Sequence, residues 1–294
     1  MLGLDGEACT GCGLCQPACP QGAIALFAPL PVDADLALVA CDRSGPLSSA
    51  KVACIHGVDL ATLATLHATG VRRLDVRTGD CASCTYGSAP AFETRLETFN
   101  AMMASRGLSP FIRIGDREKA SHVWSDGRDE EPENPGRRRL LMRVSGAGDP
   151  PPQPARLAAL SALLMRPGAP VPDAACHRAV PHIDPARCTG CDMCMRACPD
   201  NALGLGASGG GYSCYRIEPG ACTGCGICVS LCEAEAISLS MGGTGSVQEL
   251  VLASATCQSC GATYHRPGML PDNGGRCPTC AHTRHHAKLF QVMR

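Results

Sequence analysis

The hydrophobic pattern of residues 31–120 predicts short strands that alternate with helices. Apolar runs that are typical of buried strands lie at 36–39, 51–53, 74–76 and 111–114. Between them, apolar residues at helical spacing predict helices over 60–69 and 92–106, each followed by a glycine. Alternating strands and helices predict a small parallel α/β domain, although the nine residues 42–50 barely suffice for a parallel crossover.

The pattern outside this domain predicts further short elements. Three apolar segments lie at the same offset from a preceding cysteine and indicate a repeat that ends in a strand: 22–26, 202–205 and 236–239. A helix is expected at 155–165. Six prolines among charged residues in 127–154, Arg137–Arg139 included, are typical of a linker. Gly206–Gly211 is expected at a hairpin tip.

Composition changes this picture, because only 3% of the 294 residues are aromatic. Large apolar side chains are scarce, so small modules held by metal are favoured over one large core. The net charge of −1 gives no indication of nucleic-acid binding. Neither a signal peptide nor an apolar run of about 18 residues is found, and we expect a cytoplasmic protein without a membrane span.

The 22 cysteines are the dominant feature of the sequence. In a reducing compartment, such a number indicates thiolates on metals rather than disulfides. The pattern C-x2-C-x2-C-x3-C occurs three times, and in paired copies the fourth cysteine of each run ligates the other cluster. Two [4Fe-4S] sites are predicted: site I with Cys188, Cys191, Cys194 and Cys232, and site II with Cys222, Cys225, Cys228 and Cys198.

These paired runs resemble the bacterial two-cluster ferredoxins over residues 181–241. The resemblance implies a ferredoxin-like domain, in which a strand, a cluster loop and a short helix are repeated about a pseudo-twofold axis. Glu233 stands where the family has a proline after the last cysteine, and this affects the turn more than the ligation. The alternative interpretation is a disulfide framework.

The third run predicts another [4Fe-4S] site near the N-terminus, site N, with Cys9, Cys12, Cys15 and Cys19. This run has no adjacent partner. Either Cys19 completes the site itself, or a distant thiolate does so. Cys176 and Cys214 are the unassigned candidates, and each could equally be a buried thiol that packs as a small hydrophobe.

A fourth set of cysteines lies in the α/β domain: Cys41, Cys54, Cys81 and Cys84, here called site M. They follow predicted strands, and the carboxyl ends of strands in open α/β sheets are where ligands collect. The segment resembles the iron-sulfur electron-transfer subunit of methyl-viologen-reducing hydrogenase in Cys54–Gly57, in Asp59–Leu60 and in the last two cysteines. The resemblance implies a [2Fe-2S] cluster. Alternatively, Cys81 and Cys84 form a redox dithiol and Cys41 is a core thiol.

The last cysteines fit a zinc ribbon, because two C-x2-C pairs are separated by sixteen residues. The ribbon site comprises Cys257, Cys260, Cys277 and Cys280. Four thiolates fill a structural Zn²⁺ site. We therefore expect the neighbouring histidines to lie outside the coordination sphere: His265, His282, His285 and His286. Balanced charge and a single nearby aromatic residue, Tyr264, favour a protein partner over a nucleic acid.

The expected architecture is a multi-module α+β and α/β chain with five segments: 1–30 with site N, 31–120 with the α/β domain, 121–175 with a linker and short helix, 176–245 with the ferredoxin domain, and 246–294 with the zinc ribbon. No nucleophile elbow, phosphate-binding loop or dinucleotide fingerprint occurs. The chain is expected to be non-catalytic alone and to relay single electrons to or from a larger oxidoreductase or carrier protein. The first alternative is a maturation protein that delivers clusters or electrons to a metalloenzyme. The second alternative is a redox-sensing regulator.

Overall fold

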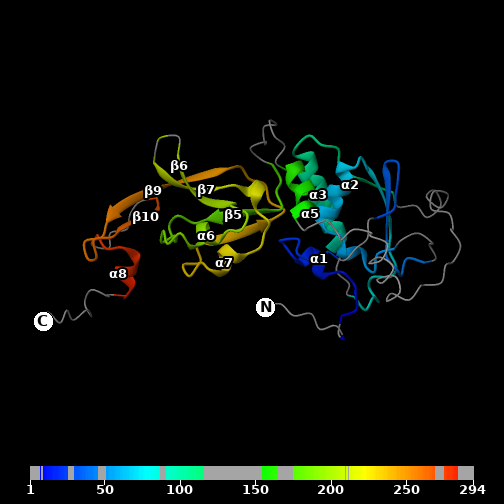
Figure 1. Cartoon of the computed structure of the whole chain (residues 1–294), viewed down its shortest axis with the longest axis horizontal. Coiled ribbons are helices and arrows are strands. Elements are labelled where there is room, and N and C mark those ends of the chain that lie inside the picture. The colour runs from blue at the N-terminus through cyan, green and yellow to red at the C-terminus, as the bar shows by residue number, and fades with distance from the viewer. Residues whose placement is uncertain are drawn as a thin grey trace, which may run out of the picture. The chain divides into compact units, whose positions relative to one another are not determined.

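The computed structural model describes residues 7, 9–25, 30–45, 51–86, 91–114, 154–164, 175–208, 210, 212–268 and 275–283. The chain divides into two compact units, residues 1–170 and 171–294 (Figure 1). Several predictions fall outside the described residues: the linker before Pro154, Gly209 and Gly211 of the hairpin tip, the side chain of His282, and His285 with His286.

The first unit contains a four-stranded sheet in the order β1-β2-β3-β4. Its strands are β1 (Val32–Asp33), β2 (Leu36–Ala40), β3 (Arg73–Arg77) and β4 (Ile112–Ile114). The last three are parallel, as predicted, and every residue of β2 is buried. The short strand β1 pairs antiparallel with β2, which makes the sheet mixed and was not expected.

Helices of the first unit are α1 (Cys15–Ala18), α2 (Leu60–Ala68), α3 (Ala91–Ala104) and α5 (Pro154–Leu164), with a 3₁₀ turn η1 at Ile55–Gly57. Asp59 begins α2, because its side chain accepts a hydrogen bond from the Thr62 N–H at 2.8 Å. Gly70 and Gly107 follow the ends of α2 and α3 with φ of 98° and 67°, which only glycine adopts readily. Helix α2 packs against α3 and α5.

The strand predicted at 51–53 is wrong. Val52 makes only an isolated parallel bridge with Cys41, in which its N–H donates to the Ala40 carbonyl at 2.9 Å. The connection of residues 42–50 is too short to hold a crossover helix. The chain therefore forms a single bridge with the sheet at Val52 and continues into η1. The strand predicted at 22–26 is also absent over residues 22–25, the part that the structure describes.

The second unit begins with two halves that have the same element order. One half runs through β5 (Ala179–Ile183), α6 (Met193–Ala197) and β6 (Leu203–Ala207), and the other through β7 (Ser213–Ile217), α7 (Ile227–Ser230) and β8 (Ile237–Met241). Antiparallel pairs join the halves, because β5 pairs with β8 and β6 with β7. This is the repeat that the ferredoxin resemblance implies.

A longer strand extends this unit toward its C-terminal part. Strand β9 (Gln248–Thr256) pairs with β7 on one side and with β10 (Thr263–Pro267) on the other, in the order β10-β9-β7-β6. The sheet therefore continues across residue 245, where the sequence places a module boundary. Helix α8 (Pro278–Thr283) carries the last cysteine. Across the described ranges of both units, every helix falls short of the length and apolarity that a bilayer crossing requires.

Candidate metal centres

Both halves of the second unit contribute to site I. Cys188 and Cys191 lie in the loop after β5, Cys194 lies in α6, and Cys232 follows α7. Burial raises the pKa of the Cys188 thiol, and the N–H of Gly190 lowers it. The charges of Cys191 and Cys232 lie near enough to raise the same pKa again. Cys232 thus lies beside cysteines of the opposite half.

Site II has the corresponding arrangement. A pocket of about 320 Å³, part of it open to solvent, is lined by Cys198 together with Cys222, Cys225 and Cys228. Burial raises the pKa of the Cys222 thiol, and the N–H of Gly224 lowers it. The charges of Cys228, Cys198 and Cys225 raise it further, in that order. Cys198 comes from the end of α6, so this site also draws on both halves.

Burial makes these thiols difficult to ionise without a metal. The pKa of Cys194 rises to about 12, mainly through burial and then through the charges of Cys188 and Cys191. A thiolate is the form that ligates metal, and cationic iron supplies the compensating charge. The buried cysteines of both sites therefore fit a metal group better than they fit free thiolates.

The loops of all three runs need left-handed backbone at matching positions. In the run of site II these positions are Gly224 and Gly226, with φ of 75° and 76°. Site N has Gly11 and Gly13 there, with φ of 68° and 79°. The run of site I has Gly190, with φ of 75°, but its second left-handed residue is Asp192, with φ of 61°. Aspartate tolerates this conformation better than most residues, yet the exchange indicates a separate role for its side chain.

That role is a hydrogen-bond network which the sequence did not reveal. Oδ1 of Asp192 accepts from the Tyr215 hydroxyl at 2.7 Å and lies 2.8 Å from His265 Nε2. Tyr215 is buried, and burial followed by the hydrogen bond to Asp192 raises the pKa of its hydroxyl, so it stays protonated and donates. Local spacing could not show this network, because its members are separated by 23 and 73 residues.

Site N shares local geometry with the other runs. The Ala23 N–H donates to Cys19 Sγ at 3.2 Å, and the Ala236 N–H donates to Cys232 Sγ at the same distance and offset. Cys9 is exposed, whereas Cys12, Cys15 and Cys19 are half-buried. Helix α1 contacts η1, which follows Cys54 of site M in the chain.

The two unassigned cysteines are buried in the second unit. Cys214 lies in β7 with no exposed surface and is paired with Gly206 on β6. Cys176 Sγ donates to the Gly242 carbonyl at 3.4 Å. Both environments favour the interpretation that these thiols pack as small apolar side chains.

The structure brings the four cysteines of site M to one pocket. Cys41 follows β2, and Cys81 and Cys84 follow β3. Cys54 precedes η1 instead of following a strand, yet it lines the same pocket of about 320 Å³. Burial raises the pKa of its thiol, the His56 N–H lowers it, and the charges of Cys84, Cys41 and Cys81 raise it again. The carboxyl edge of the sheet thus collects four thiols.

His56 also lines this pocket and was not singled out from the sequence. It is buried, and its Nδ1 accepts from the Phe92 N–H at 3.2 Å, so a neutral ring carries its proton on Nε2. Burial lowers the pKa of His56, which keeps the ring neutral. Nε2 has no hydrogen-bond partner among the described residues, and a buried donor of this kind fits a pocket that receives a sulfur-rich group.

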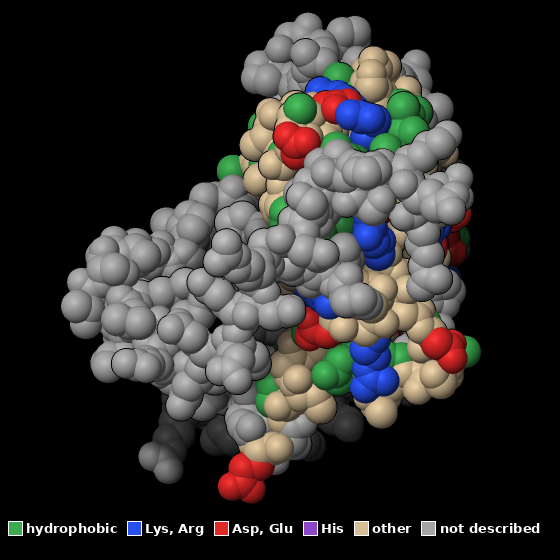
Figure 2. All heavy atoms as spheres, turned by 90° about the vertical axis from the view of Figure 1, so that its right-hand side faces the viewer, with side chains coloured by type: hydrophobic (Ala, Val, Ile, Leu, Met, Phe, Trp, Pro, Cys, Tyr) green, Lys and Arg blue, Asp and Glu red, His purple; other side chains and the backbone are tan. Residues whose placement is uncertain are grey.

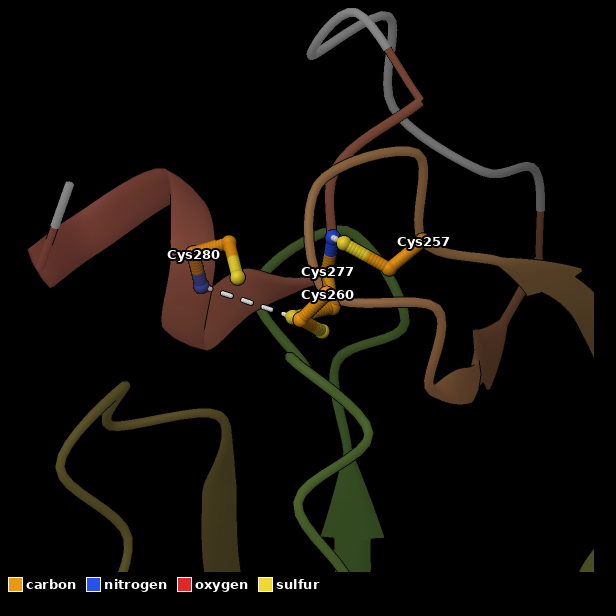
Figure 3. Close-up of side chains that lie close together, drawn as sticks. All are labelled: Cys257, Cys260, Cys277 and Cys280. Carbon is orange, nitrogen blue, oxygen red and sulfur yellow. Dashed lines mark hydrogen bonds between the residues drawn. The ribbon is translucent and has the colours of Figure 1, made fainter. Parts of the chain in front are cut away.

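The ribbon site is the most compact group of thiols. All four sulfur atoms lie within 4.8 Å of one another, and their side chains converge in Figure 3. The Cys277 N–H donates to Cys257 Sγ at 3.2 Å, and the Cys280 N–H donates to Cys277 Sγ at 3.4 Å. The first of these bonds lowers the pKa of Cys257 to about 6, while burial and the other three thiols raise the pKa of Cys280 to about 12. Zn–S bonds of about 2.3 Å place tetrahedral sulfurs roughly 3.8 Å apart, which fits this group.

Sulfur spacing separates the ribbon from the other sites. The described residues include all 22 cysteines, and among them the ribbon alone has three or more donor atoms within 4.8 Å of one another. The sulfurs of sites I, II, N and M converge less closely.

The surface of the first unit carries mixed charge. On the face drawn in Figure 2, basic and acidic side chains are interspersed among the described atoms. Ion pairs at the surface of this unit include Arg73 with Asp35 and Arg113 with Glu93. A concentrated basic footprint for nucleic acid is not visible on the described part of this face.

Comparison with known families agrees with the geometry of three of these sites. The model of the 4Fe-4S binding domain matches residues 3–25, 181–204 and 215–238, which contain the three cysteine runs. No curated protein matches the chain. The resemblance of the middle segment to a hydrogenase subunit thus has no support from relatives. The chain carries three 4Fe-4S binding motifs, and these indicate in general terms a role in iron-sulfur electron transfer.

Proposed function

We propose that this protein relays single electrons through [4Fe-4S] clusters at sites I and II to or from a larger oxidoreductase. The observation that carries the proposal is the exchange of cysteines between halves, since Cys198 lies with the run of site II and Cys232 lies with the run of site I. This is the ligation rule of paired clusters.

In this function the protein holds and tunes the clusters. A bound [4Fe-4S] cluster supplies one-electron chemistry with little atomic motion. The chain contributes four thiolates per site and N–H donors to sulfur. Gly190 donates toward Cys188 and Gly224 toward Cys222, at matching loop positions. Such hydrogen bonds stabilise negative charge on sulfur and raise the reduction potential.

The remaining sites extend the proposal. Site N would hold a third [4Fe-4S] cluster, site M a [2Fe-2S] cluster and the ribbon site a structural Zn²⁺. Site N and site M belong to the same unit, where α1 contacts η1, so an electron could pass between them. The four-cysteine pocket and the buried His56 support a cluster at site M.

Metal analysis and electron paramagnetic resonance (EPR) of the reduced, anaerobically purified protein test this proposal. We expect about 8 to 14 iron atoms and one zinc per chain, because two cubanes are the minimum and sites N and M add to them. A colourless protein without iron, with its thiols bridged in pairs, would refute it.

Substitutions of two buried cysteines, one inside site I and one outside every site, test the ligand assignment. Cys194→Ala removes a buried thiol of site I, and we expect it to abolish one cubane signal and to unfold much of its domain, since cluster binding and folding are linked. Cys214→Ala removes a thiol that is also buried but lies outside every site, and it should keep the full iron content. Full iron and fold in Cys194→Ala would show that the ligand assignment is wrong.

Cluster delivery to an immature metalloenzyme is the second candidate function. The exposed Cys9 favours it, because a cluster at site N would be accessible to an acceptor. Incubation with an apo-protein acceptor and a mild chelator distinguishes the two. A relay keeps its iron and cycles reversibly, whereas a delivery protein loses a cluster to the acceptor.

A further inference from the structure

We propose that strand β10 of the ribbon packs against the loop of site I and holds it in place, and that Arg266 raises the reduction potential of the cluster bound there. The inference rests on the proposed function, because it requires a cluster at site I. It assigns the ribbon a task in the second unit beyond holding its own metal.

The first observation is the close approach of β10 to the loop. A Cβ atom on Gly190 would collide with the backbone carbonyl of His265. At the matching position of site II, a Cβ on Gly224 would meet the flexible end of Met241 at 3.0 Å. The two cluster loops thus have the same conformation but different neighbours. The backbone of β10 lies against Gly190 and not against Gly224.

The second observation is the position of Arg266. Its Nη2 donates to the carbonyls of Pro185 and Ala186 at 3.0 and 3.1 Å, in the segment just before Cys188. Its Cα would lie 3.0 Å from a Cβ atom on Gly190, two residues after Cys188. Its Nε is buried and has no hydrogen-bond partner among the described residues. A buried N–H beside a cluster thiol can donate to cluster sulfur.

The third observation is the side-chain network that holds β10 in place. His265 Nε2 lies 2.8 Å from Asp192 Oδ1, and the His265 ring lies edge-on to Tyr215 with centroids 5.9 Å apart. Asp192 sits between Cys191 and Cys194 of the loop. At site II the residue that matches Asp192 is Gly226, which has no side chain to form such a network.

The electrostatic consequence differs between the two clusters. Reduction adds one negative charge, and a nearby cation stabilises that charge. Outside its own sheet, the contacts of Arg266 among the described residues lie at Pro185, Ala186 and Gly190, on either side of Cys188, and none of them lies in the run of site II. Arg266 therefore raises the potential of site I selectively.

An anaerobic redox titration monitored by EPR tests the inference on the full-length protein. Arg266→Gln should lower the midpoint potential of the site I cluster and leave site II unchanged. Arg266→Lys keeps the charge and should lie closer to the wild type. Arg216→Gln, an exposed arginine on β7 of the same sheet, should change neither potential. The signal altered by Cys191→Ser identifies site I, because that cysteine is exposed and its exchange adds no buried cavity.

Two results would overturn the inference: wild-type potentials at both clusters in Arg266→Gln, or an equal shift at both. A wild-type protein without cubane signals would instead refute the proposed function itself. The two failures are therefore distinguishable in the same experiment.

Discussion

At the scale of single residues, two glycines with the same backbone conformation differ in the atoms packed against them. Gly190 and Gly224 both have φ of 75°. Any side chain there pays about 1–2 kcal/mol for left-handed backbone. Only Gly190 also faces a backbone carbonyl, which cannot move without displacing β10.

We therefore predict that Gly190→Ala is more damaging than Gly224→Ala. Both variants have the same cost of left-handed backbone. The difference between their stabilities therefore measures the collision with β10. Gly190→Ala should lose iron from site I and lower the unfolding temperature, whereas in Gly224→Ala the Met241 side chain can shift. Anaerobic thermal unfolding and cluster EPR measure both effects. Equal losses in the two variants would contradict the close packing of β10.

A buried histidine predicts a pH dependence in the first unit. His67 lies edge-on to Phe99 and Phe111, and its Nε2 donates to the Ser109 carbonyl at 2.9 Å. Burial lowers the pKa of His67 below 6.5, although the bond to Ser109 opposes this. As the pH falls, the unfolded chain therefore binds a proton at His67 more readily than the folded chain does. The contribution of His67 to stability is complete above pH 6.5 and is lost as the pH falls toward the pKa of the folded state.

His67→Gln keeps a donor for Ser109 but cannot titrate. We expect the wild type to lose more stability than this variant between pH 7.5 and about 5.5, as measured by chemical unfolding at each pH. Comparing the two proteins cancels the titration of other groups. Parallel pH profiles would show that the pKa of His67 is the same in the folded and the unfolded chain.

At the scale of elements, the chain shows which features a sequence can predict. The helical spacing around Leu63 and Phe99 predicted α2 and α3, because one buried face repeats locally. The cysteine runs predicted sites I and II, because their spacing is set by the cluster. The single bridge at Val52 and the edge strand β1 were missed, because pairing depends on distant partners.

The same limit applies within the site. The sequence placed four cysteines at the ends of strands, yet Cys54 reaches the pocket of site M from a turn. His265 was expected to lie outside the coordination sphere of the ribbon metal, and the sequence did not show that its Nε2 lies 2.8 Å from Asp192 Oδ1 of the site I loop. Its spacing from Cys260 suggested only nearness to the ribbon. The tertiary contact depends on the pairing of β9 with β7, which no local pattern encodes.

Metal removal tests the ribbon as an element. Strand β10 follows the turn that holds Cys257 and Cys260, so loss of the ribbon metal should loosen β10 and change the EPR signal of site I. The paired substitution Cys257→Ser with Cys260→Ser should remove one zinc and leave the signal of site II in place. An unchanged site I signal in a zinc-free variant would contradict the coupling.

At the scale of the whole molecule, the cysteine sites fall into two groups. Sites N and M belong to the first unit, and sites I and II and the ribbon site belong to the second. The first unit has a four-stranded sheet, the second has a four-stranded and a two-stranded sheet, and each unit has its own buried core. Loss of metal in one unit is therefore expected to leave the metal content of the other intact.

Replacement of both Cys81 and Cys84 by serine tests this independence. We expect loss of the [2Fe-2S] signal assigned to site M, with about two fewer irons and full retention of both cubane signals of the second unit. Zinc should remain at one per chain. A simultaneous loss of cubane signals would show that the units do not bind metal separately.

The central place of β7 in its sheet affects the exchange of backbone hydrogens with solvent. Its amides and carbonyls are bonded to β6 on one side and β9 on the other. Release of these amides requires that both neighbours separate, so β7 should be among the last segments of the second unit to take up deuterium. The part of β9 that pairs with β7 would share this protection, and the ribbon and the cluster domain would open as one cooperative body.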